Sequence, residues 1–287
     1  MKRSQRAQMA EETVAIVESG SYRSSSGRHI DITEEVRTCL ERTTYHQPED
    51  LGRIRDEILA VPAEGLARTI EVVNETTLAG IARLLNSAGG PVAALNFASA
   101  KNPGGGFLNG SQAQEESLAR SSALFASQQR AFVFYERHRA SSSLLYSDSI
   151  ILSPDCPIFR DDDGALLDEP RSAAFITCAA PNAGAIATNR PQEHSEIPET
   201  LARRAERVLA LAASRGYRQI VLGAWGCGVF RNEPALVASI FARLLNGPWS
   251  GRFDHVAFSV LDDSPSLETL RAFESALNVR SVRSGSD

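Results

Sequence analysis

The sequence predicts an α/β fold: a three-layer α/β/α sandwich around a mixed, mostly parallel sheet, with a helical extension at the N-terminus. Three observations predict it. From residue 69 onward, short and almost continuously apolar segments alternate with helical segments, a pattern typical of strands buried on both faces of a parallel sheet. The residues before 60 have mixed, mainly helical patterning instead. No low-complexity linker separates the two regions.

The N-terminal region begins with a predicted helix over residues 5–19. Small and β-branched apolar residues recur there at helical spacing, and Gly20 follows as a stop. A hairpin that turns at residues 25–27 comes next, followed by a helix over 33–42 with acidic residues in its first turn. A further helix starts near Asp50.

The alternating region contains the strands and helices of the expected sandwich. The predicted strands cover residues 69–74, 91–98, 149–152, 172–180, 218–225 and 253–261. The predicted helices cover residues 78–88, 116–130, 198–215, 233–245 and 265–277. In such folds ligands bind beyond the carboxyl ends of the strands. We therefore expect the functional residues in the loops that follow these strands.

The domain organisation follows from the same patterns. Residues 1–60 are expected to form a helical extension packed on the core, and residues 61–277 the main domain. Residues 278–287 are polar and are expected to form a flexible tail.

Composition excludes several classes of function. The 287 residues are 43% hydrophobic, enough for a large core. The net charge of −5 argues against a DNA-binding protein, which needs a basic face. The N-terminus lacks the apolar run of a signal peptide, and no stretch approaches the roughly 20 apolar residues of a membrane span. A cytoplasmic location without membrane contact is expected.

Neither the cysteines nor the histidines predict a metal site. The four cysteines include no C-x-x-C pair, so they indicate neither a disulfide framework nor a zinc site, and they fit a reducing compartment. The five histidines are dispersed without metal-ligand spacing. The acidic segment 160–169 fails the spacing of a calcium loop at Phe159 and is expected to form a hairpin turn. No metal site is therefore predicted.

A first candidate ligand loop follows the predicted strand over residues 91–98. Gly104, Gly105 and Gly106 lack a Cβ, so their backbone can bring N–H groups against a phosphate oxygen. A flexible surface turn after Pro103 is an equal alternative, because glycine runs alone are weak signals.

A second glycine loop, residues 221–232, follows another predicted strand and precedes a helix. Its glycines fit neither a P-loop nor the dinucleotide fingerprint. A glycine loop that leads to a helix N-terminus nevertheless suits a diphosphate, because the helix end offers free N–H groups and the positive end of its dipole. Because two such loops follow strands of the same sheet, we expect them to bind one diphosphate from two sides. Cys227, inside this loop, resembles a nucleophile but is expected to pack among its small neighbours.

The triplet Gln114-Glu115-Glu116 follows the first glycine loop. One interpretation is structural, because Ser111-x-x-Gln114 has capping-box spacing and acids in a first helical turn favour the helix dipole. The other is catalytic, because cleavage of a glycosidic bond needs a carboxylic acid to protonate the leaving group and a carboxylate to activate water. A helix N-terminus lowers a carboxyl pKa, whereas burial, a second carboxylate or a bound diphosphate raises it.

Together these motifs resemble the signature of poly(ADP-ribose) glycohydrolases of the bacterial type, which are built on a macrodomain. The resemblance rests on the glycines 104–106, the seven residues that follow them and the triplet 114–116. Asn96, the pair Asn102-Pro103 and the segment 223–232 add to the resemblance, which covers roughly residues 60–277. The fold implied is a macrodomain-like sandwich.

The resemblance also implies roles for individual residues. Glu116 would be the catalytic acid/base, and Glu115 would position the distal ribose and the leaving oxygen. Gln114 would hold the loop, and Asn96 would hydrogen-bond the distal ribose. The remaining substrate-binding residues implied are those of the two glycine loops: Gly104, Gly105, Gly106, Gly226, Cys227, Gly228, Val229 and Phe230. Phe230 would pack near the distal ribose, with an ordinary core aromatic as the alternative. The segment 180–185 is either part of an adenine pocket or a plain turn.

The activity implied is hydrolysis of the ribose–ribose O-glycosidic bonds of poly(ADP-ribose) from the chain end, releasing ADP-ribose. Poly(ADP-ribose), ADP-ribose and poly-ADP-ribosylated proteins would be the partners, and no cofactor is implied. The alternatives are a macrodomain that only reads ADP-ribose, a hydrolase of single ADP-ribose units, and a nucleotide-binding regulatory protein in which the triplet merely starts a helix.

Overall fold

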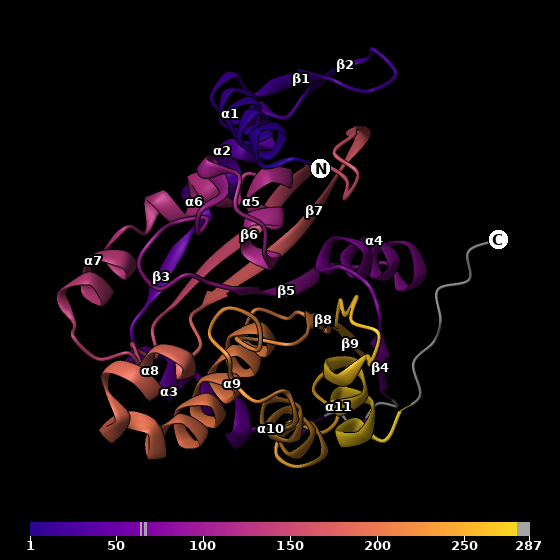
Figure 1. Ribbon diagram of the computed structural model, residues 1–287. Helices are drawn as coiled ribbons and strands as arrows, with labels where there is room; N and C mark the ends of the chain where they lie inside the picture. The colour runs from indigo at the N-terminus through magenta and orange to yellow at the C-terminus, as the bar shows by residue number, and fades with distance from the viewer. Residues whose placement is uncertain (64, 66–67, 280–287) are drawn as a thin grey trace.

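The computed structural model describes residues 1–63, 65 and 68–279, and its central feature is a seven-stranded sheet with helices on both faces (Figure 1). The strand order is β3-β6-β7-β5-β8-β9-β4, and a separate hairpin pairs β1 with β2. The strands are β1 Ser21–Arg23, β2 His29–Asp31, β3 Thr44–His46, β4 Thr69–Val73, β5 Val92–Phe97, β6 Ile150–Arg160, β7 Leu166–Cys178, β8 Gln219–Leu222 and β9 His255–Ser259.

The sheet is mixed and mostly parallel, as predicted. β7, β5, β8, β9 and β4 run parallel to one another, whereas β6 is antiparallel to both β7 and β3. The carboxyl ends of β4, β5, β8 and β9 therefore lie at one edge of the sheet, where ligands bind in folds of this type.

Helices form one layer on each face of the sheet. α1 Arg3–Ser19, α2 Thr33–Arg42, α4 Thr77–Ala88, α5 Gln114–Ser121 and α6 Leu124–Arg130 cover one face. α3 Pro48–Ala60, α8 Ala183–Asn189, α9 Ile197–Ser214, α10 Pro234–Asn246 and α11 Glu268–Leu277 cover the other (Figure 1). The short helices η1 Phe107–Asn109 and η2 Pro191–Glu196 and the helix α7 Val133–Ala140 complete the described elements.

The apolar side chains of β5 explain why both layers pack so closely. Val92 and Ala94 belong to the core under α4 and α5, and Ala93 and Leu95 belong to the core under α9 and α10. Successive residues of a strand point to opposite faces, so a continuous apolar run buries both. β5 is thus held rigidly in the centre of the sheet, and it positions the loop that follows it.

The N-terminal helix packs directly on the segment between the glycine loop and α5. Arg3 Nε and Arg6 Nε donate to the backbone oxygens of Asn109 and Gly110, each over 2.8 Å. Thr13 Oγ1 donates to the Arg120 backbone oxygen over 2.5 Å. The extension therefore buttresses the elements that carry the candidate site.

Most predicted elements are present, with their ends shifted by a few residues. The helix predicted over 5–19 is α1, which ends at Gly20 with a left-handed φ of 70°, and the hairpin and the helix over 33–42 are also confirmed. The acidic segment 160–169 does form a hairpin turn, but the strands on either side are longer than predicted. The edge strand β3 was not predicted, and the tail from residue 280 lies outside the described residues.

One predicted helix is wrong. The pattern over residues 116–130 predicts a continuous helix, whereas the chain forms two helices, α5 and α6, separated at Ser122 and Ala123. Ser122 is extended, with φ −151° and ψ 178°, and forms a bridge to Ile158 of β6. The Ala123 N–H also bonds the Pro157 oxygen over 3.1 Å. Pairing with the sheet thus replaces helical hydrogen bonds at this point.

Candidate active site

A cavity of about 1280 Å³ opens at the carboxyl edge of the parallel strands. Its walls come from the segments after β4, β5, β8 and β9 and from α5. Both predicted glycine loops contribute, as do the carboxylates of the triplet. The structure thus brings together groups that lie more than a hundred residues apart in the sequence.

The first glycine loop approaches the first turn of α5. Gly104 and Gly105 have left-handed φ values of 63° and 60°, which side chains other than glycine rarely adopt. A Cβ on Gly105 would lie 2.4 Å from Glu116 Oε1. The Gly106 N–H donates to that same oxygen over 3.0 Å. Gly105 is therefore required by the close approach of Glu116, whereas a Cβ on Gly104 would meet Phe107 and one on Gly106 would meet Ser111.

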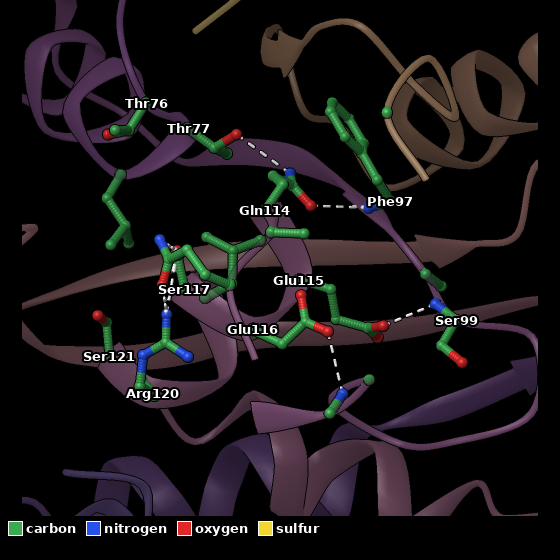
Figure 2. Close-up of a pocket in the computed structure, with 18 of the residues that line it drawn as sticks. Thr76, Thr77, Phe97, Ser99, Gln114, Glu115, Glu116, Ser117, Arg120 and Ser121 are labelled. Atoms are coloured by element: carbon green, nitrogen blue, oxygen red, sulfur yellow. Dashed lines mark hydrogen bonds between the residues drawn. The ribbon is translucent and has the colours of Figure 1, made fainter. Parts of the chain in front are cut away.

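Glu115 is buried, with 3% of its surface exposed, and three donors surround its carboxyl group. Ser99 N donates to Oε2 over 2.6 Å, while Gln128 Nε2 and Asn96 Nδ2 donate to Oε1 over 2.8 and 3.1 Å. Figure 2 shows the side chain directed towards Ser99, beside that of Glu116. The three donors fix the position of this carboxyl group.

Burial raises the pKa of Glu115 to about 8. The hydrogen bonds from Ser99, Gln128 and Asn96 lower the pKa, and the charge of Glu116 raises it further, but loss of solvation is the largest effect. Near neutral pH the side chain is therefore mainly a neutral carboxylic acid. The adjacent pair then carries less negative charge than two free carboxylates would.

Gln114 does not belong to a capping box. α5 begins at Gln114, its N-cap residue is Ala113, and no side chain caps it, so the structural interpretation of Ser111 and Gln114 is wrong. The Gln114 side chain instead accepts from Phe97 N over 2.9 Å (Figure 2). It also donates to the Leu95 oxygen over 2.8 Å. These bonds attach the start of α5 to the end of β5, which is why the triplet stands beside the glycine loop.

Asn96 lies beneath the cavity instead of lining it. The side chain is fully buried and donates to Thr177 Oγ1 over 3.1 Å as well as to Glu115. Its Oδ1 is buried without a protein hydrogen-bond partner. The predicted hydrogen bond to a ribose stays a prediction, and the geometry gives Asn96 a role in holding Glu115.

The second glycine loop lines the opposite part of the cavity. Gly226 has φ 75°, and a Cβ there would lie 2.5 Å from the Ala180 Cβ and 2.6 Å from Asn232 Nδ2. Val229 is 81% exposed, and the Phe230 ring lies 6.0 Å from that of Tyr146. Gly228 and Phe230 both line the cavity. The loop is thus tightly folded at its base and open at its tip.

Cys227 lies in the second glycine loop and lines the cavity. Burial raises the pKa of the Cys227 thiol to about 12, so the thiol is neutral and is a poor nucleophile.

The segment 180–185 is not a plain turn, because it leads into α8, where Asn182 Oδ1 caps the helix by accepting from Ala185 N over 3.0 Å. It supports the second loop through Gly184 N, which donates to the Phe230 oxygen over 2.9 Å, and it does not line the cavity.

Sequence reasoning missed the residues that connect these parts. Gln128, fully buried, accepts from Gly104 N over 2.7 Å and donates to Glu115. Arg120 lines the cavity, and its guanidinium bonds the Ser111 oxygen over 2.7 Å and the Gln112 side chain. No motif marks either residue; the only available signal was a polar side chain on the buried side of a helix.

The described part of the chain contains neither a metal-binding cluster nor a membrane-spanning helix. Among residues 1–63, 65 and 68–279, no group of three or more His, Cys, Asp or Glu side chains is arranged to hold a metal ion. Over the same residues, no helix is long and apolar enough to cross a membrane.

Comparison with known proteins identifies close relatives of this arrangement. The family model for the catalytic domain of microbial-type PARG matches residues 10–161. The crystal structure of poly(ADP-ribose) glycohydrolase from Thermomonospora curvata is 48% identical, with a TM-score of 0.91 over 95% of this chain and 99% of that chain. No curated protein sequence matches.

Two similar structures contain ligands. The T. curvata glycohydrolase bound to the inhibitor ADP-HPD is 48% identical, with a TM-score of 0.88 over 95% of this chain and 99% of that one. The glycohydrolase from Deinococcus radiodurans in complex with ADP-ribose is 46% identical, with a TM-score of 0.82 over 86% of this chain and 98% of that one.

Proposed function

Because this chain belongs to the family of microbial-type poly(ADP-ribose) glycohydrolases, we propose that it hydrolyses the ribose–ribose O-glycosidic bonds of poly(ADP-ribose) and releases ADP-ribose. Similar structures were solved with ADP-ribose and with the inhibitor ADP-HPD. We place the terminal ADP-ribose unit in the cavity between the two glycine loops. The glycines let the diphosphate approach the backbone of both loops closely. The predicted N–H donors of the first loop are already used within the protein, because Gly104, Gly105 and Gly106 donate to Gln128, Asn102 and Glu116.

The hydrogen bond from Gly106 N to Glu116 Oε1, 3.0 Å long, carries the proposal. It places a partly exposed carboxyl group directly beside the diphosphate loop. A diphosphate held by that loop puts its distal ribose next to this group, within the reach that proton transfer needs. Glu116 is therefore proposed as the acid/base.

The reaction then proceeds through one carboxyl group that acts twice. Glu116 gives its proton to the leaving 2′-oxygen as the bond from the distal C1″ to that oxygen breaks, and an oxocarbenium-like ribose forms. Water adds to C1″, and its proton passes to the Glu116 carboxylate. The products are ADP-ribose and a polymer shortened by one unit with a free 2′-hydroxyl. The reaction is a hydrolysis and needs no oxidant or reductant.

Glu115 is proposed to position the substrate and to limit the negative charge of the site. Both of its oxygens already accept protein hydrogen bonds, so it is less free than Glu116 to follow a reacting atom. As a carboxylic acid near neutral pH, it adds little repulsion towards a bound diphosphate. The raised pKa thus favours binding of an anionic substrate.

Several finer features also belong to the proposal. Cleavage from the chain end, a cytoplasmic location and poly-ADP-ribosylated proteins as partners all follow from the same assignment. The division into an extension over residues 1–60, a catalytic core over 61–277 and a tail over 278–287 is also proposed, and it rests on the change of sequence pattern near residue 60. The edge strand β3 pairs with β6, so the extension contributes one strand to the sheet of the core.

Incubation of the protein with purified poly(ADP-ribose) tests the function. Release of free ADP-ribose, separated by chromatography, is expected. Binding of ADP-ribose without shortening of the polymer would favour a reader instead. Release of ADP-ribose only from singly modified proteins would favour a mono-ADP-ribosyl hydrolase.

A further inference from the structure

An exposed aromatic ring stands at the rim of the cavity, held by a cation. Phe132 lines the cavity with 36% of its surface exposed. The Arg139 guanidinium lies 5.1 Å from its ring centroid. Arg139 Nε donates to the Lys101 oxygen over 2.8 Å, which fixes the guanidinium beside the loop after β5. We call Phe132, Arg139, Lys101 and Asn102 the rim surface.

The rim surface adjoins the reacting end of the cavity. Ser99 N bonds Glu115, and Lys101 follows two residues later. In α6, Gln128 also bonds Glu115, and Phe132 follows four residues later, in the segment that joins α6 to α7. Both segments that carry the rim surface therefore begin at groups that bond Glu115. The second glycine loop follows β8, on one side of β5, whereas α7 packs against β6 on the other side (Figure 1).

The chemistry of the rim surface fits a nucleotide. Adenine stacks on exposed aromatic rings, and arginine and lysine pair with a diphosphate. Lys101 and Arg139 are both exposed, in a chain whose net charge is −5. An exposed phenylalanine at the mouth of a cavity otherwise leaves apolar surface in contact with water. Positive charge beside a flat ring matches a unit that carries both an adenine and two phosphates.

We propose that the rim surface binds the ADP-ribose unit next to the terminal one, with its adenine on Phe132 and its phosphates near Arg139 and Lys101. The inference rests on the proposed function, which places the scissile bond at Glu115 and Glu116. The polymer then leaves the cavity across α7. The surface would select polymer over free ADP-ribose without taking part in the chemical step.

Kinetics on polymer and binding of ADP-ribose separate this surface from the cavity. Phe132→Ala is expected to raise KM for long polymer about tenfold, as loss of one base–aromatic stack does, with kcat within twofold of wild type. Phe132→Tyr retains a ring and is expected to keep the wild-type KM. Arg139→Gln is expected to reduce the slope of log affinity for polymer against log salt by about 0.7. The calorimetric Kd for ADP-ribose stays within twofold in every variant.

Two exposed side chains serve as controls. Val133→Ala changes a neighbouring exposed side chain that does not line the cavity, and Arg243→Gln removes an exposed charge on α10; neither is expected to alter KM. An unchanged KM in Phe132→Ala would overturn the proposal, and so would an equal loss of affinity for ADP-ribose. A wild type that binds no ADP-ribose and releases none would reject the proposed function itself.

Discussion

Gln128 and Glu115 are joined by a buried hydrogen bond of 2.8 Å, and the same glutamine amide accepts from Gly104 N over 2.7 Å. One fully buried side chain therefore connects the first glycine loop to the carboxyl pair. The loop that would hold the diphosphate and the group that would face the ribose are thus fixed relative to each other through the interior. Catalysis depends on such fixed distances between binding and reacting groups.

Replacing Gln128 by leucine should uncouple the two parts of the site. The Gly104 N–H would then be buried without a partner, and Glu115 would lose a donor, which costs about 2 kcal/mol of unfolding free energy. We also expect at least a tenfold loss of kcat on polymer. Denaturant unfolding and steady-state kinetics measure the two effects. The exposed Gln8→Leu is the control, and a Gln128→Leu protein with wild-type stability and kcat would refute the link.

Gly105→Ala should displace Glu116. The new Cβ would lie 2.4 Å from Glu116 Oε1, and the residue has a φ of 60°. We expect a loss of about 1 kcal/mol from the left-handed backbone and a fall in kcat of a hundredfold or more. Gly27→Ala, at φ 88° with no atom within 4 Å of its Cβ, carries a similar backbone strain without the collision. Equal activity in the two variants would rule out the displacement.

The buried acid Glu115 should give stability a specific pH dependence. Its pKa in the folded protein, about 8, lies above the ordinary 4.5, so the folded state keeps a proton that the unfolded chain releases. The stabilisation is complete below pH about 4.5 and is lost as the pH rises towards 8. Relative to Glu115→Gln, the wild type should lose about 1.4 kcal/mol per pH unit between pH 5 and 8. Chemical unfolding at several pH values measures this, and a constant difference would contradict the burial argument.

The sequence predicted the fold well because each layer carries its own periodic pattern. The apolar run of β5 is buried on both faces, and helices such as α1 and α9 lie within two residues of their expected bounds. The glycine loops were also found, because strained or crowded backbone needs glycine. Each of these features depends on residues that are close together in the sequence.

What the sequence could not show depends on partners that are distant in the chain. The break between α5 and α6 arises because Ser122 pairs with Ile158 of β6. The sequence predicted only the first part of that strand, residues 149–152, and not the part that contains Ile158. Gln114 has capping-box spacing, but its side chain bonds β5 instead. Gln128 has no motif at all, and only the fold brings it to Glu115. The burial that raises the pKa of Glu115 is a property of the assembled core.

We propose that Glu116 performs the acid/base chemistry while the glycine loops bind the ligand. The direct measurement compares wild type with Glu116→Gln for release of ADP-ribose from polymer and for calorimetric binding of ADP-ribose, with the exposed Glu57→Gln as the control. Loss of a general acid/base typically costs about 10²–10⁴-fold in rate, so we predict a fall of that order in Glu116→Gln with binding within a few-fold of wild type. Unchanged turnover in Glu116→Gln would contradict the account.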